Sequence, residues 1–375
     1  MKIEAAVSRE GAAFPEIETV DIDVPRAGEV LVRVLASGVC HTDLSAHAGG
    51  KRDGLTPKPI VLGHEGAGIV EEIGAGVTTL KVGDHVVMSG SSCGVCPSCR
   101  RNYPSYCHEV LPRNFGGLRP DGSTALRKGG ERIFAQFFGQ SSFARYAIAP
   151  ERTAVKVPGD LPLDVLAPLG CGVITGTGAV INSLGVGAGD SLAVFGVGGV
   201  GLSAVMAACI AGATQIIAVD INPARLALAR ELGATAVVNP DERNPAGMIK
   251  DMTRHGVNYS FNTTQVPAIW DAAVDCLTMR GVAGFVTAPR GAWAPPLFPM
   301  LATGKSIKGI LGGDAAPQIF IPMLAEYYRQ GRLPLERLIR FYRFEDIAAA
   351  FRDTSGGETV KPVLRMGSPV DRNGE

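Results

Sequence analysis

The sequence lacks an excess of charge of either sign. Its 375 residues include 36 lysines and arginines against 36 aspartates and glutamates, and aromatic residues make up only 6%. Without a net positive field or a basic stripe, we expect no binding to nucleic acid or to an anionic membrane. The length exceeds one ordinary hydrophobic core, so we expect two domains.

The N-terminal residues, MKIEAAVSREG, contain no apolar segment or small-residue cleavage site of the secretory type, which predicts a cytoplasmic protein. Uncharged runs between Asp164 and Asp190, and between Asp190 and Asp220, are long enough to span a bilayer. The first contains Pro168 and seven glycines, and the second is patterned as strand, glycine-rich turn and helix. We therefore interpret both runs as the buried core of a domain.

Two kinds of pattern divide the chain. In about the first 170 residues, apolar and polar residues alternate with the period of a strand, as at 29–35 and 68–74. From about residue 190, short apolar strands alternate with helical stretches, which is typical of a parallel, doubly wound sheet. The expected strands of this sheet are 191–195, 215–219, 236–239, 259–262, 284–287 and 306–311.

The C-terminal segment lies beyond this complete set of strands. It is patterned as a helix at 317–331, a strand at 340–344, a helix to residue 352 and a strand at 360–364. We assign it to the first domain. The predicted fold class is α/β, with a doubly wound parallel sheet at 173–315 inserted into a β-rich domain made of 1–172 and 316–375.

A glycine-rich turn, GVGGVG at 196–201, follows an expected strand and opens an alanine-rich helix. In a dinucleotide-binding turn of the Rossmann type, Gly196 permits the tight bend, Gly198 lets the backbone approach a pyrophosphate, and Gly201 lets helix and strand pack closely. The N-terminus of the helix supplies N–H groups and a partial positive charge for the anion.

Asp220 ends the next strand, about 20 residues past the glycines, where an acid binds the adenosine ribose. A carboxylate there repels a 2′-phosphate, so NAD is favoured over NADP. Arg225 is a candidate contact to the adenosine end, or else a solvated arginine on a helix face. The alternative for the whole motif is a glycine-rich turn of any α/β fold, with Asp220 as a loop acid.

Four of the eight cysteines form a C-x2-C-x2-C-x7-C motif. Such short gaps let thiolates converge on one ion, and four sulfurs fill a tetrahedral zinc site, which would then be structural. The alternatives are an iron–sulfur cluster, or a zinc ribbon that contacts nucleic acid through Arg100 and Arg101. The motif consists of Cys93, Cys96, Cys99 and Cys107.

Each of the other four cysteines stands alone in the sequence, and Cys40 and Cys171 are two of them. Their spacing alone does not predict a shared metal site with His64, because a lone cysteine or histidine is usually a core residue. Cys209 and Cys276 lie on helical stretches with apolar neighbours, so we expect both to pack in the core.

Several motifs together resemble the zinc-dependent alcohol dehydrogenases of the medium-chain dehydrogenase/reductase superfamily. They are CHTD at 40–43, GHEGAG at 63–68, the four-cysteine lobe at about 90–110 and the glycine-rich turn, and the resemblance runs from about residue 20 to Leu364. It implies that the β-rich domain is a GroES-like catalytic domain. The chain would carry two zinc ions, one catalytic and one structural, and use NAD.

The stretches NFGG at 114–117 and DGS at 121–123 are more similar to the aryl- and allylic-alcohol dehydrogenases of this family. This implies interconversion of primary alcohols and aldehydes of the benzyl, perillyl or geraniol type, by hydride transfer from a zinc-bound alkoxide. The alternatives are an S-(hydroxymethyl)glutathione/formaldehyde dehydrogenase or an aliphatic alcohol dehydrogenase of the same superfamily, and, more remotely, a zinc-binding protein without turnover.

The resemblance also implies roles for individual residues. The catalytic zinc would be held by Cys40, His64 and Cys171. Glu65 would lie behind the metal and be able to approach it as a further ligand, or else only balance its charge. Asp43 would orient His64, and Thr42 would take the proton of the alcohol. The cofactor-binding residues would be His41, Thr175, Gly196, Gly198, Gly199, Val200, Gly201, Asp220, Arg225 and Lys361.

One position departs from many relatives, which carry a histidine three residues after the threonine to pass the proton to solvent. Ser45 stands there. Either His47 or water is a candidate to carry the proton instead, and the alternative for His47 is an exposed loop histidine. Candidates for an apolar substrate wall, or else for ordinary core packing, are Phe115, Leu118, Ala288 and Pro289. The resemblance further implies a homodimer through the edge strands of the nucleotide domain, with a tetramer as the alternative.

Overall fold

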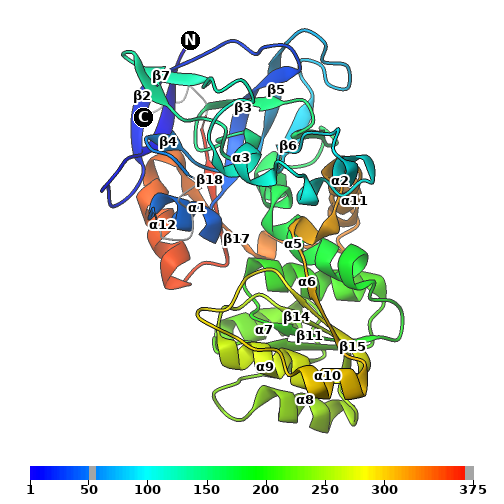
Figure 1. Cartoon of the computed structure of the whole chain (residues 1–375). Helices are drawn as coiled ribbons and strands as arrows, with labels where there is room; N and C mark the ends of the chain where they lie inside the picture. The colour runs from blue at the N-terminus through cyan, green and yellow to red at the C-terminus, as the bar shows by residue number, and fades with distance from the viewer. Residues whose placement is uncertain (50–55, 368–375) are drawn as a thin grey trace. The chain divides into compact units, whose positions relative to one another are not determined.

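A computed structural model describes residues 1–49 and 56–367 (Figure 1). The chain divides into two compact units. Unit 1 contains Met1–Cys171 and the C-terminal segment that begins at Ala316, and unit 2 is Gly172–Ala315.

Unit 1 is built on two sheets, as far as the described residues extend. The smaller sheet has the strand order β4-β1-β2-β7-β8. Its strands are β1 (Lys2–Ser8), β2 (Glu16–Ile22), β4 (Ile60–Val61), β7 (Leu126–Lys128) and β8 (Glu131–Ile133).

The larger sheet of unit 1 joins the two ends of the chain. Its order is β10-β6-β5-β3-β18-β17, and β9 also pairs with β3. Strand β18, near the C-terminus, runs antiparallel to β3, with Val363 opposite Gly38. The strands are β3 (Glu29–Gly38), β5 (Glu65–Ile73), β6 (His85–Met88), β9 (Tyr146–Pro150), β10 (Ala154–Lys156), β17 (Ile339–Arg343) and β18 (Lys361–Arg365).

Short helices connect these strands. The α-helices are α1 (His41–His47), α2 (Pro97–Arg100), α3 (Val110–Phe115), α4 (Leu163–Leu166), α11 (Pro317–Arg329) and α12 (Ile347–Gly356). The 3-10 helices are η1 (Pro104–Tyr106), η2 (Phe137–Gly139), η3 (Ala167–Gly170), η6 (Leu335–Arg337) and η7 (Phe344–Asp346). Fully buried Phe143 and Phe344 belong to one apolar cluster that is shared by both segments of unit 1.

Unit 2 is a parallel sheet with the order β13-β12-β11-β14-β15-β16. All residues of β11 are buried, as expected of a strand covered on both faces. The order reverses at β11, which lies between β12 and β14, and ligands of doubly wound sheets bind beyond the carboxyl ends of strands at such a point. The predicted α/β fold class is thereby confirmed.

The elements of unit 2 follow one another as strand and helix. The strands are β11 (Ser191–Phe195), β12 (Gln215–Val219), β13 (Ala236–Val238), β14 (Val257–Asn262), β15 (Leu277–Phe285) and β16 (Ser306–Gly309). The helices are α5 (Gly172–Gly178), the π-helix η4 (Ala179–Leu184), α6 (Gly199–Ala211), α7 (Pro223–Glu231), α8 (Pro245–Thr253), α9 (Pro267–Asp275), α10 (Leu297–Thr303) and the 3-10 helix η5 (Gly312–Asp314).

The limits of β15 differ from the expected strand at 284–287. The strand begins seven residues earlier, at Leu277, and its pairing with β14 is irregular between Val257 and Tyr259. Met279 is exposed and Arg280 has φ of +61°. This bulge breaks the alternation of buried and exposed residues, so the pattern does not reveal the first half of the strand.

No single helix in residues 1–49 and 56–367 has both the length and the apolar composition to cross a membrane. One bent pair, Leu163–Gly170 with Gly172–Leu184, meets that test by length and composition alone.

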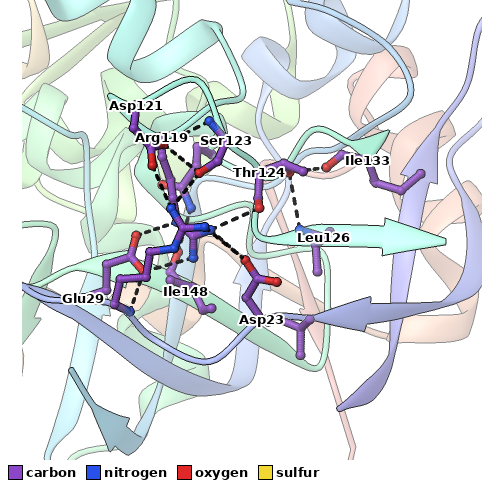
Figure 2. Close-up of polar contacts among 12 residues, drawn as sticks. Asp23, Glu29, Arg119, Asp121, Ser123, Thr124, Leu126, Ile133 and Ile148 are labelled. Carbon is purple, nitrogen blue, oxygen red and sulfur yellow. Dashed lines mark hydrogen bonds and ion pairs between the residues drawn. The ribbon is translucent and has the colours of Figure 1, made fainter. Parts of the chain in front are cut away.

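A buried arginine holds the segment that follows α3. The guanidinium of Arg119 donates two hydrogen bonds to the carboxylate of Glu29, at 2.8 and 3.0 Å, and one to Asp23 at 2.8 Å (Figure 2). It also donates to the carbonyl of Thr124 at 3.1 Å. The side chain of Arg119 is only 3% exposed. The charge of Arg119 is therefore paired, as a buried charge must be. The pairs hold this segment against the first residue of β3 and the residue that follows β2.

Candidate metal and cofactor sites

Four side chains from three separate parts of unit 1 meet at one point. Cys40 precedes α1, and Cys171 follows η3. His64 immediately precedes β5, and Glu65 is the first residue of that strand. One potential ligand atom from each lies within 4.8 Å of the others. The structure thus brings together residues that no spacing in the sequence connects.

Asp43 orients two of these groups. Its Oδ1 lies 2.9 Å from Nδ1 of His64 and accepts from the Gly63 N–H at 3.0 Å, while its Oδ2 accepts from the Cys40 N–H at 2.9 Å. Asp43 and His64 are both fully buried. An Nδ1–H that donates to Asp43 leaves the lone pair on Nε2, which is the tautomer that a metal requires.

The donor set fits a zinc ion. Nε2 of His64 is buried and has no hydrogen-bond partner, which is costly unless something else binds it. The hydrogen bond from Cys171, together with the charges of His64 and Lys361, holds the pKa of Cys40 well below its usual range. The same contact with Cys40, and burial, raise the pKa of Cys171. Two sulfurs and one imidazole are ligands that zinc prefers, and three of them leave a position open.

Burial lowers the pKa of His64, but the charge and hydrogen bond of Asp43 outweigh burial and raise it well above its usual value. The pocket therefore favours a positive charge at Nε2. A metal ion that binds there replaces a proton, so metal binding releases protons.

Glu65 forms a buried ion pair with Lys361. Nζ of Lys361 lies 2.9 Å from both carboxylate oxygens and 3.5 Å from the Val39 carbonyl. Burial lowers the pKa of Lys361, but the charges of Glu65 and Cys40 outweigh it and raise the pKa above its usual value. Lys361 thus binds Glu65 within unit 1, and its contact to a cofactor pyrophosphate stays a prediction.

Helix α1 carries the residues expected to handle the proton. The hydroxyl of Thr42 lies 3.8 Å from Sγ of Cys40, and the side chains of His41 and Ser45 are exposed. The reading of His47 as an exposed loop histidine is wrong. His47 ends the helix, is buried, and its Nδ1 forms a 2.7 Å hydrogen bond with Oγ of Ser8.

Two aromatic rings contact His64, and a third packs against them. The ring of Phe138 stacks on the imidazole with centroids 4.5 Å apart, and Phe137 meets it edge-on at 5.6 Å. Phe115 lies 5.2 Å from Phe138. Phe138 has φ of +52°, a strained value for a residue with a side chain, and such strain collects at functional sites. Of these three, only Phe115 was a sequence candidate, because Phe137 and Phe138 read as an ordinary apolar pair.

The four-cysteine motif folds into a second cluster. The sulfurs of Cys93, Cys96, Cys99 and Cys107 all lie within 4.8 Å of one another. Backbone N–H groups point at the sulfurs, from Cys96 to Cys93 and from Cys93 to Cys107, each at 3.3 Å. Hydrogen bonds from the N–H groups of His108 and Cys99 lower the pKa of Cys96 to about 6. These donors stabilise thiolates, the form that binds metal.

The glycine-rich turn of unit 2 has the shape of a dinucleotide cradle. Gly196 has φ of +82°, and a Cβ on Gly201 would lie 2.0 Å from the Gly196 carbonyl oxygen. A Cβ on Gly198 would meet nothing within 4 Å, so this backbone faces open space at the N-terminus of α6. Gly199 and Val200 begin that helix and are half-buried. The residues thus fit a pyrophosphate, which binds at helix N-termini.

Asp220 follows β12 next to this turn. Its Oδ2 accepts from the Val197 N–H at 2.9 Å, and its Oδ1 accepts from the Asn222 N–H at the same distance. Arg225 is half-buried on α7, and Thr175 is half-buried on α5. The carboxylate is therefore fixed in orientation against the glycine-rich turn.

The remaining cysteines differ from each other. Cys276 is fully buried, as expected, but Cys209 is exposed, so the prediction that both pack in the core is wrong for Cys209. Cys209 lies near the end of α6, where its sulfur is 3.6 Å from the carbonyl oxygens of Leu232 and Gly233. Of the wall candidates, Phe115 and Leu118 belong to unit 1, and Ala288 and Pro289 belong to unit 2.

Unit 1 is β-rich and carries two groups of side chains that could hold a metal ion, and unit 2 is a doubly wound sheet with a dinucleotide-type turn. These features are those of a zinc-binding dehydrogenase. The comparisons agree, because residues 26–159 match the alcohol dehydrogenase GroES-like domain and residues 199–327 match the zinc-binding dehydrogenase domain. The chain belongs to the zinc-dependent alcohol dehydrogenases of the medium-chain dehydrogenase/reductase superfamily, as its motifs indicated.

Individual relatives match nearly the whole chain. It is 46% identical over 366 residues to geraniol dehydrogenase of Castellaniella defragrans, covering 96% of this chain and 97% of that protein. A zinc-binding-domain alcohol dehydrogenase protein from Burkholderia ambifaria has a similar solved structure, with a TM-score of 0.95, 49% identity and coverage of 98% and 100%. For benzyl alcohol dehydrogenase from Acinetobacter calcoaceticus, the TM-score is 0.93, the identity 43% and the coverage 98% and 100%.

Proposed function

We propose that the protein oxidises primary allylic or aromatic alcohols to aldehydes with NAD. The observation that carries this proposal is the convergence of Cys40, His64 and Cys171 around a buried imidazole nitrogen that has no hydrogen-bond partner. In this reaction the carbinol carbon loses a hydride to NAD⁺, the hydroxyl loses a proton, and the products are an aldehyde and NADH.

Cys40, His64 and Cys171 would hold the catalytic zinc, and the cluster of Cys93, Cys96, Cys99 and Cys107 a structural one. The catalytic zinc supplies a Lewis acid that lowers the pKa of the alcohol. The protein keeps this site rigid. Asp43 fixes the imidazole and the backbone before α1, and Lys361 balances the charge of Glu65, which the family places behind the metal.

Thr42 would take the hydroxyl proton of the alcohol. Its hydroxyl lies on the first turn of α1, 3.8 Å from Sγ of Cys40, so it belongs to the same small region as the ligand atoms. A threonine hydroxyl can accept one proton while it donates its own onward, which is what a relay requires. Because Ser45 replaces the usual histidine, we propose that water carries the proton beyond Thr42.

The aromatic cluster supports the substrate class. Phe115 and Phe138 are only partly buried; the ring of Phe138 stacks on His64, and Phe115 packs against Phe138. A conjugated alcohol is planar near its hydroxyl and packs well against such rings. The similarity to a geraniol dehydrogenase and a benzyl alcohol dehydrogenase points to the same class.

For the cofactor, the glycine-rich turn would bind the pyrophosphate and Asp220 the adenosine ribose, with Gly199, Arg225, His41, Thr175, Val200 and Lys361 as further contacts. The fixed carboxylate of Asp220 supports NAD rather than NADP, because it repels a 2′-phosphate.

Steady-state kinetics with geraniol, benzyl alcohol, ethanol and S-(hydroxymethyl)glutathione, together with the zinc content per chain, test the proposal. We expect two zinc ions, and the highest kcat/KM with geraniol or benzyl alcohol. Cys40→Ser should lose one zinc and the activity, whereas Cys209→Ser, at an exposed cysteine, should lose neither. A preference for S-(hydroxymethyl)glutathione would overturn the proposed substrate class. One zinc ion per chain and no turnover of any alcohol would overturn the proposal that the protein is an enzyme.

We further propose a homodimer through the edge of the unit 2 sheet. In the described residues β16 stands at the end of the strand order, and Leu297, Phe298 and Leu301 of the neighbouring α10 are largely exposed. An open edge beside an apolar patch favours pairing with a second copy. Sedimentation should give a dimer that Leu301→Asp dissociates, while Ile319→Asp, at an exposed residue of unit 1, leaves it intact. A monomeric wild type, or equal effects of both changes, would contradict the dimer.

A further inference from the structure

A buried glutamine that is not one of the candidate ligands contacts the backbone on both sides of Glu65, the first residue of β5. The amide nitrogen of Gln140 donates to the His64 carbonyl at 3.0 Å, and its amide oxygen accepts from the Gly66 N–H at 3.0 Å. The side chain thus closes around Glu65 and fixes the peptide units that set the direction of His64. Gln140 is 1% exposed, so water does not compete for these bonds.

The same amide also contacts the backbone directly after β6. Its nitrogen also donates to the Ser89 carbonyl at 3.2 Å, and the hydroxyl of Ser89 donates to the Gly170 carbonyl at 2.7 Å. Gly170 is the residue before Cys171, and its backbone lies so close to β6 that a Cβ there would be 2.2 Å from the Met88 carbonyl oxygen. Gln140 and Ser89 therefore connect the backbone at His64 with the backbone at Cys171.

The segment that carries Gln140 is itself fastened to the loop before His64. The N–H of Ser142 donates to the Gly63 carbonyl at 2.9 Å, and the hydroxyl of Ser141 donates to the Val61 carbonyl at 2.6 Å. Two residues of the segment, Phe138 and Ser141, have positive φ values of 52° and 51°. Such backbone is tolerated only where the surroundings determine it, which makes the segment a rigid support.

We propose that Gln140 and Ser89 are positioning residues that set the separation of His64 and Cys171 and thereby the strength of metal binding at that site. This inference rests on the proposed function, because it takes these side chains as the zinc ligands. Gln140 does not touch the ligand atoms. It acts through the peptide groups beside them, as partners of metal ligands commonly do, with effects of roughly 10–100-fold on metal affinity.

The test is the rate at which zinc leaves the protein for a chromogenic chelator, measured on the full zinc-loaded chain. Gln140→Leu keeps the size of the side chain but loses all three hydrogen bonds, and it should release the catalytic zinc at least about tenfold faster. The matched control is Gln136→Leu. Gln136 is also buried, and its amide bonds the Ile148 carbonyl at 3.2 Å, away from His64. It should leave the release rate within about twofold of wild type.

Ser89→Ala is a milder second variant that removes only one hydroxyl. It allows the proposal to be tested even if Gln140→Leu folds poorly. It should also speed zinc release, and its effect should not multiply fully with that of Gln140→Leu, because both cut one connection. The visible absorption of cobalt substituted at the same site should shift in both variants and not in Gln136→Leu.

Equal release rates for Gln140→Leu and Gln136→Leu, or wild-type release and cobalt spectra in Ser89→Ala, would overturn the inference. Failure of the proposed function is distinguishable, because it would appear as an unchanged zinc content in Cys40→Ser, before any of these variants is compared.

Discussion

Replacing Arg119 by leucine should destabilise unit 1 far more than the same change at an exposed arginine. Arg119 is 3% exposed, and its partner Glu29 is 11% exposed. Leucine removes every donor that the guanidinium supplies and leaves the carboxylate of Glu29 with the Arg26 N–H, which donates to it at 2.9 Å. Breaking a buried ion pair from one side costs about 3–5 kcal/mol, because the remaining charge stays buried.

Arg343 provides the matched comparison. It also pairs with one carboxylate through two bonds, to Asp346 at 2.8 and 3.1 Å, but its side chain is 77% exposed. Solvent screens an exposed pair of this kind, so Arg343→Leu should change the stability little.

The assay is the midpoint of thermal unfolding of the zinc-loaded protein by calorimetry. At about 2–4 °C per kcal/mol for a unit of roughly 150–250 residues, Arg119→Leu should lower Tm by about 6–20 °C. Adding Glu29→Gln to Arg119→Leu should recover part of the loss, because the unpaired charge is gone. Equal Tm shifts for the two leucine variants would refute the reasoning that burial makes the loss of the Arg119 ion pairs costly for stability.

Three further predictions concern titration and the cofactor. The hydrogen bond from Arg9 lowers the pKa of Glu18 from 4.5 to about 2. This pair therefore stabilises the folded state above pH about 4.5, and its contribution disappears as the pH falls towards 2. In acid unfolding followed by circular dichroism, Glu18→Gln should lose this pH-dependent part of the stability. Asp220→Asn should raise the ratio of kcat/KM with NADP to that with NAD by roughly tenfold, and an unchanged ratio would show that the charge does not select the cofactor. Ser45→His should shift the pH profile of alcohol oxidation, because the new imidazole titrates near neutral pH, and an unchanged profile would mean that this position does not limit proton exit.

The sequence alone predicted those parts of the molecule that local patterns determine. The strands 191–195 and 215–219 coincide with β11 and β12, since buried parallel strands appear as short apolar runs between turns. The four-cysteine cluster was also predictable, because its ligands follow one another within 15 residues of chain. The second group of ligands became a candidate through family resemblance, since no spacing links Cys40 to Cys171.

Other features depend on contacts between distant residues, which leave no local pattern. His47 looked like a loop histidine because nothing nearby in sequence reveals Ser8, which is 39 residues away. Gln140 and Arg119 look like ordinary polar residues of a glycine-rich region, and only the folded backbone shows that each one is buried with several partners. Cys209 was misplaced for the opposite reason, since its apolar neighbours face inward while it does not.

The ion pair between Glu65 and Lys361 joins residues that are 296 positions apart. During synthesis on the ribosome, β5 emerges long before β18, so Glu65 cannot pair with Lys361 until 296 further residues have been made. Strand β3 likewise waits for β18 with part of its edge open. The larger sheet, and with it the final electrostatic environment of Cys40 and His64, is therefore completed only after β18 has emerged. Contacts of such high sequence separation form slowly. A metal ion that enters earlier would meet a site whose charge is not yet balanced, so we expect stable zinc loading to follow the pairing of β18 with β3.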